Sequence, residues 1–182
     1  MSRVPAINPA TATGQTKDLL DAVKAGLGVV PNFLRVLANS PTALQSFLGF
    51  HGIAGHGALD HQTQERIALA VAQQNGCDYC LAAHSAIGRK AGLSTADIQA
   101  ARLGSADDAK ANAAIAFSSA LLRDLGNVSD AEFEAVRQAG HSDAEIVEII
   151  AHTALNIFTN VLNKAVQVEV DFPAAAPLDR AA

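Results

Sequence analysis

The chain has 182 residues, of which 49% are hydrophobic and only 17% are charged, and its formal net charge is −5. The length suits one domain, and the acidic balance without a basic run excludes nucleic acid as an expected partner. The charged share lies below the roughly 25% typical of soluble domains, so a single small globule would be short of polar surface. We therefore expect a homo-oligomer, with an alanine-rich monomer as the alternative.

Apolar residues recur at helical spacing through the first part of the chain. One stripe covers residues 19–27, and a short second helix covers residues 33–37. The chain breaks at Ser40-Pro41, where Ser40 suits an N-cap and Pro41 suits the first position of a helix that continues through residues 44–51. The pattern predicts three helices before residue 55.

The middle of the chain predicts a helical hairpin. A helix from about His61 to Gln74 is expected to end at Asn75-Gly76, because asparagine and glycine favour helix C-termini. The next helix is expected from about Cys77 to Gly92. Two antiparallel helices joined at Asn75-Gly76 would place their side chains against each other.

Three later helix starts share one capping pattern. Ser94-x-x-Asp97, Ser129-x-x-Glu132 and Ser142-x-x-Glu145 all fit the capping box. The helix that begins at Ser142 runs to about Val168 and is apolar almost all round, which is typical of a core or a subunit interface. With no sustained two-residue alternation, the fold class is all-α. We expect a single helical domain over residues 1–172 and a flexible Ala/Pro-rich tail over residues 173–182.

Nothing in the chain predicts secretion or membrane insertion. The N-terminus lacks an apolar run behind a basic start, so it is not a secretory signal. The most apolar region, residues 146–168, is interrupted by polar side chains, which argues against a membrane span. These are Glu148, His152, Asn156, Asn160, Asn163 and Lys164. We therefore expect a cytoplasmic protein, in which a C-x-x-C pair is more often catalytic or metal-binding than a structural disulfide.

The sequence Cys77-Asp78-Tyr79-Cys80, followed by His84, carries the chemistry. These two cysteines are the only ones in the chain. A sulfur in the first turn of a helix faces unpaired N–H groups, which stabilise a thiolate. Cys77 and Cys80 at i, i+3 lie on one face, and His84 at i, i+4 from Cys80 can take a proton or stabilise the thiolate. The spacing predicts redox or metal chemistry.

Glu65 is the only acidic residue in the preceding predicted helix. If the two helices pack as a hairpin, this carboxylate could reach the face of Cys80 and His84. Spacing alone favours the simpler interpretation, a solvated carboxylate near the helix start with Arg66 beside it.

Residues 65–84 together resemble the core of the alkylhydroperoxidase D / carboxymuconolactone decarboxylase family. The motif is a glutamate, eleven intervening residues, C-x-x-C, and a histidine four residues later, and the resemblance spans about residues 44–165. The layout is similar to the peroxidase-related branch of that family. The resemblance implies an all-helical oligomeric bundle that reduces organic hydroperoxides or hydrogen peroxide without a cofactor or metal.

The resemblance also implies a role for each site residue. Cys80 would be the peroxidatic cysteine that becomes a sulfenic acid, and Cys77 the resolving thiol and proton donor. Glu65 and His84 would relay protons, so the resemblance reverses the preference for a solvated Glu65. The reductant would be a dithiol, as on the lipoyl-bearing partner proteins that such peroxidases use.

One position departs from the family pattern. The founding peroxidases carry a second histidine just before the second cysteine, where this chain has Tyr79. Tyrosine is a poor base at neutral pH, although its hydroxyl can donate a hydrogen bond. The decarboxylase branch lacks the cysteine pair, so lactone decarboxylation is not expected.

Two other interpretations remain. Cys77, Cys80 and His84 could bind a metal ion, with Glu65 or another histidine as the fourth ligand, although no second cysteine pair exists. Alternatively, the protein could be a non-enzymatic, redox-sensing helical oligomer. Of the other histidines, we expect His51 at the surface or a helix end, and His152 as a hydrogen-bonded core residue.

Overall fold

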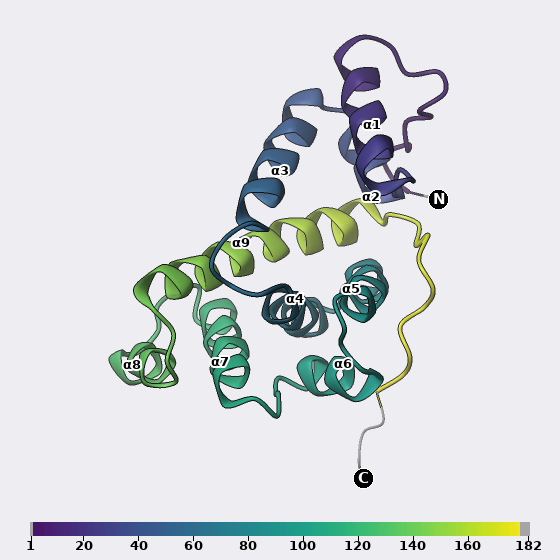
Figure 1. The fold of residues 1–182 in the computed structure, drawn as a ribbon. Coiled ribbons are helices and arrows are strands. Elements are labelled where there is room, and N and C mark those ends of the chain that lie inside the picture. The colour runs from purple at the N-terminus through teal and green to yellow at the C-terminus, as the bar shows by residue number, and fades with distance from the viewer. Residues whose placement is uncertain (1, 179–182) are drawn as a thin grey trace.

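The computed structural model describes residues 2–178 of the chain. These residues form nine α-helices and no strand, so the all-α prediction is confirmed (Figure 1). The helices are α1 (Gly14–Leu27), α2 (Asn32–Leu37), α3 (Pro41–Ala54), α4 (His61–Asn75), α5 (Asp78–Lys90), α6 (Thr95–Arg102), α7 (Ala109–Arg123), α8 (Asp130–Gln138) and α9 (Asp143–Val166).

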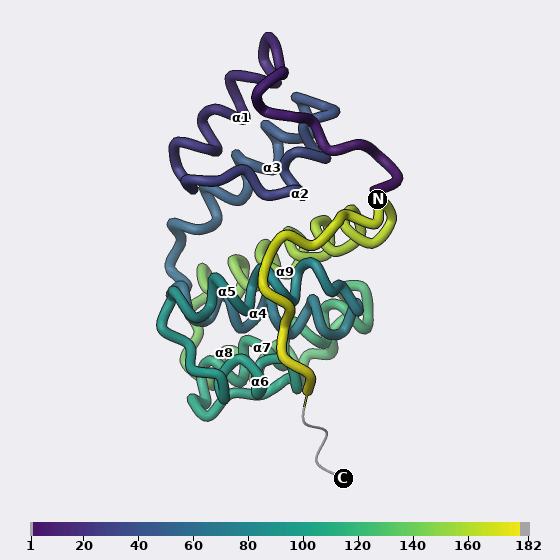
Figure 2. Tube along the Cα trace, turned by 90° about the vertical axis from the view of Figure 1, so that its right-hand side faces the viewer, coloured from purple at the N-terminus to yellow at the C-terminus, as the bar shows by residue number. Residues whose placement is uncertain are grey.

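Helix α4 lies at the centre of the bundle, and α5, α6, α7 and α9 pack around it (Figure 1). All residues from Ile67 to Ala72 are buried, which suits a helix that is apolar all round. They contribute to three separate clusters of core residues. Helices α1–α3 form a layer on the other side of α9 from α4–α8, as both views show (Figures 1 and 2).

The turn between α4 and α5 forms as the sequence predicts. Gly76 takes the left-handed conformation, with φ at 62°, which suits glycine because it has no Cβ. Cys77 follows and donates its backbone N–H to the carbonyl of Ala72 at 2.9 Å. Its side chain then caps α5, since Sγ accepts a hydrogen bond from the backbone N–H of Cys80 at 3.4 Å. Cys77 is therefore the N-cap of α5, at the helix start that the sequence predicts.

The capping boxes predicted at Ser94, Ser129 and Ser142 are all present. In each, the serine hydroxyl accepts from the backbone three residues later, and an acidic side chain accepts from the backbone of the serine. Helix α7, by contrast, was not among the predicted elements. It is largely a run of alanine and other small residues, capped by Asp108.

The segment after α9 turns back and runs along α5 and α6 (Figure 2). Asp171 accepts a hydrogen bond from the backbone N–H of Asn32 at 2.7 Å, and Arg102 donates to the carbonyl of Ala176 at 2.5 Å. Residues 173–178, the described part of the predicted flexible tail, are extended. The rest of that prediction, residues 179–182, lies outside the described residues.

Helix α9 has two faces of different character. Its length and composition would allow it to cross a membrane, yet one face packs against α4, α5 and α7 as a core helix. The remaining surface of α9 carries exposed apolar side chains beside Lys164, and one of them, Phe158, also stacks on Phe47 of α3 with ring centroids 6.3 Å apart. We call these apolar side chains the α9 stripe; they are Val147, Ile150, Ala154, Phe158, Val161 and Ala165.

Candidate active site

The residues singled out by the sequence lie on the α4–α5 hairpin. Cys77 caps α5, Cys80 and His84 follow one turn apart on α5, and Glu65 lies on α4. Both cysteines are reduced and almost completely buried, with 1% and 2% of their surfaces exposed. The hairpin therefore gathers two thiols, an imidazole and a carboxylate beneath the surface.

Glu65 and His84 form a direct pair. His84 Nδ1 lies 2.9 Å from Glu65 Oε2, and each side chain is less than one-fifth exposed. The pair is possible because α4 and α5 approach closely at Gly88, where an added Cβ would lie 3.1 Å from Leu93 Cδ1 and 3.8 Å from the Cβ of Glu65. Glu65 is thus not the solvated carboxylate that spacing alone favours.

The charge on Glu65 changes the protonation of His84. Burial by itself would lower the pKa of His84, but the Glu65 carboxylate and, more weakly, Cys80 raise it above the ordinary value. A protonated His84 in turn helps to hold Cys80 as a thiolate, because their opposite charges attract. The pair can therefore store a proton next to the sulfur.

The two thiols have opposite protonation preferences. The pKa of Cys80 is lowered to about 6, chiefly by the hydrogen bond from the Cys77 thiol, and burial opposes this only in part. The pKa of Cys77 is raised far above that of a free thiol, because the same hydrogen bond and burial keep its proton in place. Near neutral pH these preferences favour a thiolate at Cys80 and a protonated thiol at Cys77 beside it.

A further side chain contacts the sulfur of Cys80. Asn163 Nδ2, on α9, donates to Cys80 Sγ at 3.3 Å, and the residue is buried. This hydrogen bond also lowers the pKa of Cys80. In the sequence, Asn163 is recognisable only as a polar residue that interrupts an apolar helix. Its spacing from Asn156 and Asn160 marks one polar face of that helix, but no pattern connects it with a cysteine 83 residues earlier.

Tyr79 points away from the proton relay and holds other parts of the fold together. Its hydroxyl accepts a hydrogen bond from the backbone N–H of Phe33 at 3.1 Å and donates to Asp171 Oδ1 at 2.8 Å. Burial raises the pKa of Tyr79, so the phenol stays neutral. Tyr79 stands where the founding members of the resembled family have a histidine. Through these two hydrogen bonds it links α5 to α2 and to the C-terminal segment.

Replacing Tyr79 by phenylalanine should therefore affect stability rather than chemistry. The change leaves the Phe33 N–H and the Asp171 carboxylate without their partner, and we expect a loss of about 1–3 kcal/mol in the free energy of unfolding. Chemical denaturation measures this loss, and stopped-flow oxidation of Cys80 measures the chemistry. A large fall in the rate of Cys80 oxidation in the folded variant would instead make the phenol part of the relay.

Two more histidines lie near the Glu65–His84 pair. His51 lies on α3 with part of its surface exposed, and loss of water around the rest of its ring, together with the nearby charge of His84, lowers its pKa. His152 is a buried core residue whose Nε2 lies 3.2 Å from the carbonyl oxygen of Ala54, as expected. No sequence pattern connects His51 with Glu65 and His84, although its charge interacts with both. Among residues 2–178, no group of three or more histidine, cysteine or acidic side chains is arranged to hold a metal ion.

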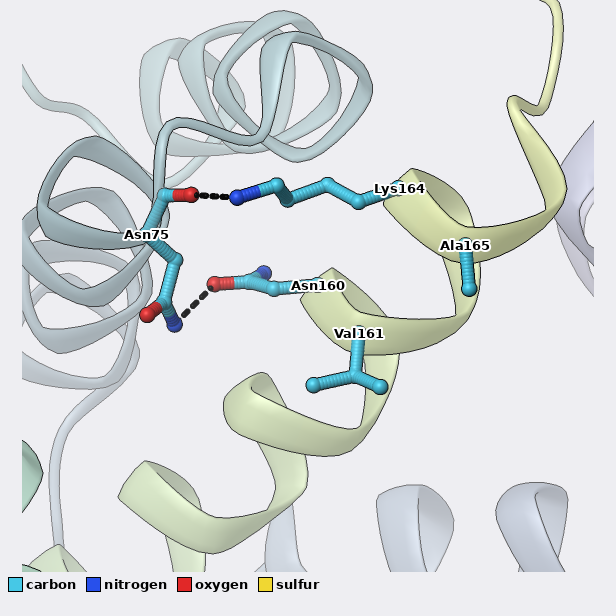
Figure 3. Close-up of a pocket in the computed structure, with 5 residues that line it drawn as sticks. All are labelled: Asn75, Asn160, Val161, Lys164 and Ala165. Atoms are coloured by element: carbon cyan, nitrogen blue, oxygen red, sulfur yellow. Dashed lines mark hydrogen bonds between the residues drawn. The ribbon is translucent and has the colours of Figure 1, made fainter.

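A pocket of about 290 Å³ lies between the end of α4 and α9 (Figure 3). In it, Asn75 Nδ2 donates to Asn160 Oδ1 at 2.9 Å, and Lys164 Nζ donates to the backbone carbonyl of Asn75. Val161 and Ala165 supply its apolar wall. Asn160 is thus reached from this pocket, while Asn163, one turn later on α9, contacts Cys80.

Part of the chain is similar to a known protein family. Residues 41–124 match the carboxymuconolactone decarboxylase family, a range that includes Glu65, Cys77, Cys80 and His84. No curated protein matches the sequence at a significant level.

Several solved structures share the fold. The alkylhydroperoxidase AhpD core of an uncharacterised peroxidase-related protein from Ralstonia eutropha JMP134 is 25% identical, with a TM-score of 0.83 over 93% of this chain and 92% of that one. An uncharacterised peroxidase-related protein from Silicibacter sp. TM1040 is 26% identical, with a TM-score of 0.75 over 90% of each chain. The debrominase Bmp8, in a cysteine-to-alanine variant bound to 2,3,4-tribromopyrrole, is 20% identical and shares the fold, with a TM-score of 0.79 over 92% of this chain and 91% of that one.

Proposed function

Because the chain carries a carboxymuconolactone decarboxylase family core at residues 41–124, within an alkylhydroperoxidase D-like fold, we propose that it is a thiol-dependent peroxidase. The observation that supports this most directly is the pairing of opposite protonation states at the two cysteines. Cys80 is held as a thiolate by the Cys77 thiol, and the Glu65–His84 pair lies beside it. A peroxidase needs a nucleophilic sulfur, a proton for the leaving oxygen and a second thiol.

The proposed cycle balances without a cofactor. The Cys80 thiolate attacks the terminal oxygen of a hydroperoxide, the O–O bond breaks, and the leaving alkoxide or hydroxide takes a proton from Cys77 or the Glu65–His84 pair. Cys80 is now a sulfenic acid, and Cys77 attacks its sulfur to form a disulfide and release water. An external dithiol, for example on a lipoyl-bearing protein, reduces the disulfide by exchange. Such a cycle suits a reducing compartment, which supports a cytoplasmic location.

A peroxide-consumption assay tests the proposal. Purified protein is mixed with hydrogen peroxide or an alkyl hydroperoxide and with dithiothreitol or dihydrolipoamide, and the two cysteines are followed by mass spectrometry. We expect repeated turnover through a Cys77–Cys80 disulfide. Consumption of one equivalent of peroxide, with no turnover on any dithiol, would instead indicate a redox sensor.

Reductive debromination is a second candidate, because the Bmp8 debrominase shares the fold over nearly the whole chain. The same thiolate can attack a bromine on an electron-rich ring: the C–Br bond breaks, and the ring carbon takes a proton from the Glu65–His84 pair. Cys77 then attacks the brominated sulfur, which forms the same disulfide and releases bromide. A brominated pyrrole added in place of the peroxide distinguishes the two reactions. Bromide release without peroxide consumption would favour this second candidate.

The Glu65–His84 pair gives a prediction about pH. Glu65→Gln keeps the shape of the side chain but removes the charge that raises the pKa of His84. We expect Cys80 oxidation to slow by about tenfold or more, since positioned proton transfer contributes at least that much in enzymes. The pH–rate profile of single-turnover oxidation measures the effect, and an unchanged profile would remove Glu65 from the relay.

We also propose that the protein is a homo-oligomer in which the α9 stripe contacts a second copy. The stripe presents exposed apolar side chains that a second copy can bury, and the small share of charged residues in the chain supports the same conclusion. Val147 and Val161 are 64% and 60% exposed.

Light scattering tests the oligomer. Ile150→Glu puts a charge into the stripe and should lower the mass of the particle in solution. Leu125→Glu is the matched control, because Leu125 is 91% exposed and lies outside the stripe. Equal masses for both variants and the unmodified protein would rule out the stripe as the interface.

A further inference from the structure

Two side-chain amides of α9 lie next to the sulfur of Cys80. Asn163 Nδ2 donates to Cys80 Sγ at 3.3 Å. Asn160, one turn earlier, also lowers the pKa of the Cys80 thiol, more weakly than Asn163 and His84 do, although its Nδ2 makes no regular hydrogen bond to the sulfur. Both residues are more than nine-tenths buried, with 0% and 5% of their surfaces exposed for Asn160 and Asn163. Their placement on one face of α9 fixes both amides against the reacting atom.

Each of these amides has one polar atom without a partner. Among residues 2–178, neither Asn160 Nδ2 nor Asn163 Oδ1 makes a hydrogen bond, although both atoms are buried. Such atoms are uncommon in folded proteins because burial removes the water that would otherwise bind them. Asn156 on the same helix is different, since its Nδ2 donates to the backbone carbonyl of His152 at 2.8 Å. In the described part of the chain, the buried side-chain atoms without a partner also include Arg66 Nε, Ser85 Oγ and His141 Nδ1, but only these two belong to the amides of α9.

The unpaired atoms match the polar end of a hydroperoxide. One is an acceptor and the other a donor, and a group R–O–O–H needs an acceptor for its hydrogen and a donor for the oxygen that leaves. We propose that Asn160 and Asn163 form the binding site for the peroxide group. Its O–H donates to Asn163 Oδ1, and Asn160 Nδ2 donates to the oxygen bonded to R. This inference rests on the proposed peroxidase function and identifies how the substrate is held.

The site also explains how bond breaking is assisted. When the thiolate attacks the terminal oxygen, negative charge develops on the oxygen bonded to R, which departs as an alkoxide and takes a proton from Cys77 or the Glu65–His84 pair. A donor already aimed at that oxygen stabilises the charge as it forms. Asn160 therefore acts on the leaving group, while Asn163 acts on the sulfur and on the peroxide hydrogen.

The competing explanation is structural. Asn160 Oδ1 accepts a hydrogen bond from Asn75 Nδ2 at 2.9 Å, which links α9 to the end of α4 (Figure 3). Loss of Asn160 would break this link as well as remove the free N–H. Asn75→Ala breaks the same link from the other side and leaves the Asn160 amide in place, so it is a matched control.

The experiment compares two reactions of Cys80 in each protein. One is single-turnover oxidation by an alkyl hydroperoxide, and the other is alkylation by iodoacetamide, which has no O–O bond to break. Asn160→Ala should lower the ratio of the peroxide rate to the alkylation rate by about tenfold, because a donor to a charged group is lost. Asn75→Ala should leave this ratio unchanged, since a structural change affects both reactions alike.

A second variant keeps the test decisive if Asn160→Ala does not fold. Asn160→Asp keeps the oxygen that accepts from Asn75 and replaces the N–H by a carboxylate oxygen, so it should lower the same ratio. An unchanged ratio of the peroxide rate to the alkylation rate in the folded Asn160 variants would refute the peroxide-binding site but not the peroxidase function. An equal fall of this ratio in Asn75→Ala would do the same. If the unmodified protein consumes no peroxide, the proposed function fails and the binding site fails with it.

Discussion

Replacement of Cys80 by serine is expected to abolish peroxide turnover. The serine hydroxyl has the same position but far weaker acidity, so no anion is available to attack the O–O bond near neutral pH. Cys80 itself is ionised there because its pKa is lowered to about 6, first by the Cys77 thiol and then by Asn163 and His84. Continuous assay of peroxide loss with a dithiol reductant measures the effect.

Two observations make this result interpretable. The melting temperature of Cys80→Ser should stay close to that of the unmodified protein, since the side chain is small and nearly isosteric. Iodoacetamide should modify Cys80 in the unmodified protein and leave the variant unlabelled at neutral pH, because Cys77 is buried and burial alone still raises its pKa. Unchanged multiple-turnover rates in Cys80→Ser would refute the assignment of the nucleophile.

The same protonation state predicts a pH dependence. Below pH 6 the Cys80 thiol becomes protonated, so the rate of sulfenic acid formation should fall by about tenfold for each further pH unit. Above pH 7 the rate should be nearly constant, whereas a free thiol with a pKa near 8.5 would still gain reactivity.

The α4–α5 hairpin shows which parts of the fold the sequence could predict. Its turn residues, its apolar runs and its capping residues are local signals, so the structure places both helices where the sequence predicts them, to within a few residues. The structure adds that the side chain of Cys77 itself caps α5, just before the first helical residue. Helix α7 was missed because small residues such as alanine give little contrast between its buried and exposed faces.

The site itself was only partly predictable. Glu65 and His84 are linked through a hairpin, so a short-range pattern and a family resemblance were enough to connect them. Asn163 reaches Cys80 from α9, and Tyr79 reaches Asp171 across 92 residues, so both contacts depend on how distant helices pack. A polar residue in an apolar helix indicates that a partner exists, but only the tertiary structure identifies it.

Two substitutions of Cys77 are expected to separate its roles as hydrogen-bond donor and resolving thiol. Neither Cys77→Ser nor Cys77→Ala can form the disulfide, so both should stop at a sulfenic acid on Cys80 after one equivalent of peroxide. Serine keeps a hydroxyl that can donate to the Cys80 thiolate, whereas alanine removes the largest influence that lowers the pKa of Cys80. The pKa of Cys80, measured by the ultraviolet absorbance of the thiolate, should therefore rise in Cys77→Ala and stay lower in Cys77→Ser.

The difference in the pKa of Cys80 between the two variants should also change the rate at which Cys80 is oxidised by the single equivalent of peroxide. At a pH near 6, each unit by which the pKa of Cys80 rises above the pH removes about nine-tenths of the thiolate, so Cys77→Ala should react about tenfold or more slowly than Cys77→Ser. At high pH, where both proteins are ionised, the two rates should converge. Serine can also cap α5 where alanine cannot, which should cost Cys77→Ala about 1 kcal/mol in stability. If the two variants titrate together, the Cys77 thiol does not set the acidity of Cys80, and the amides of α9 and His84 must do so alone.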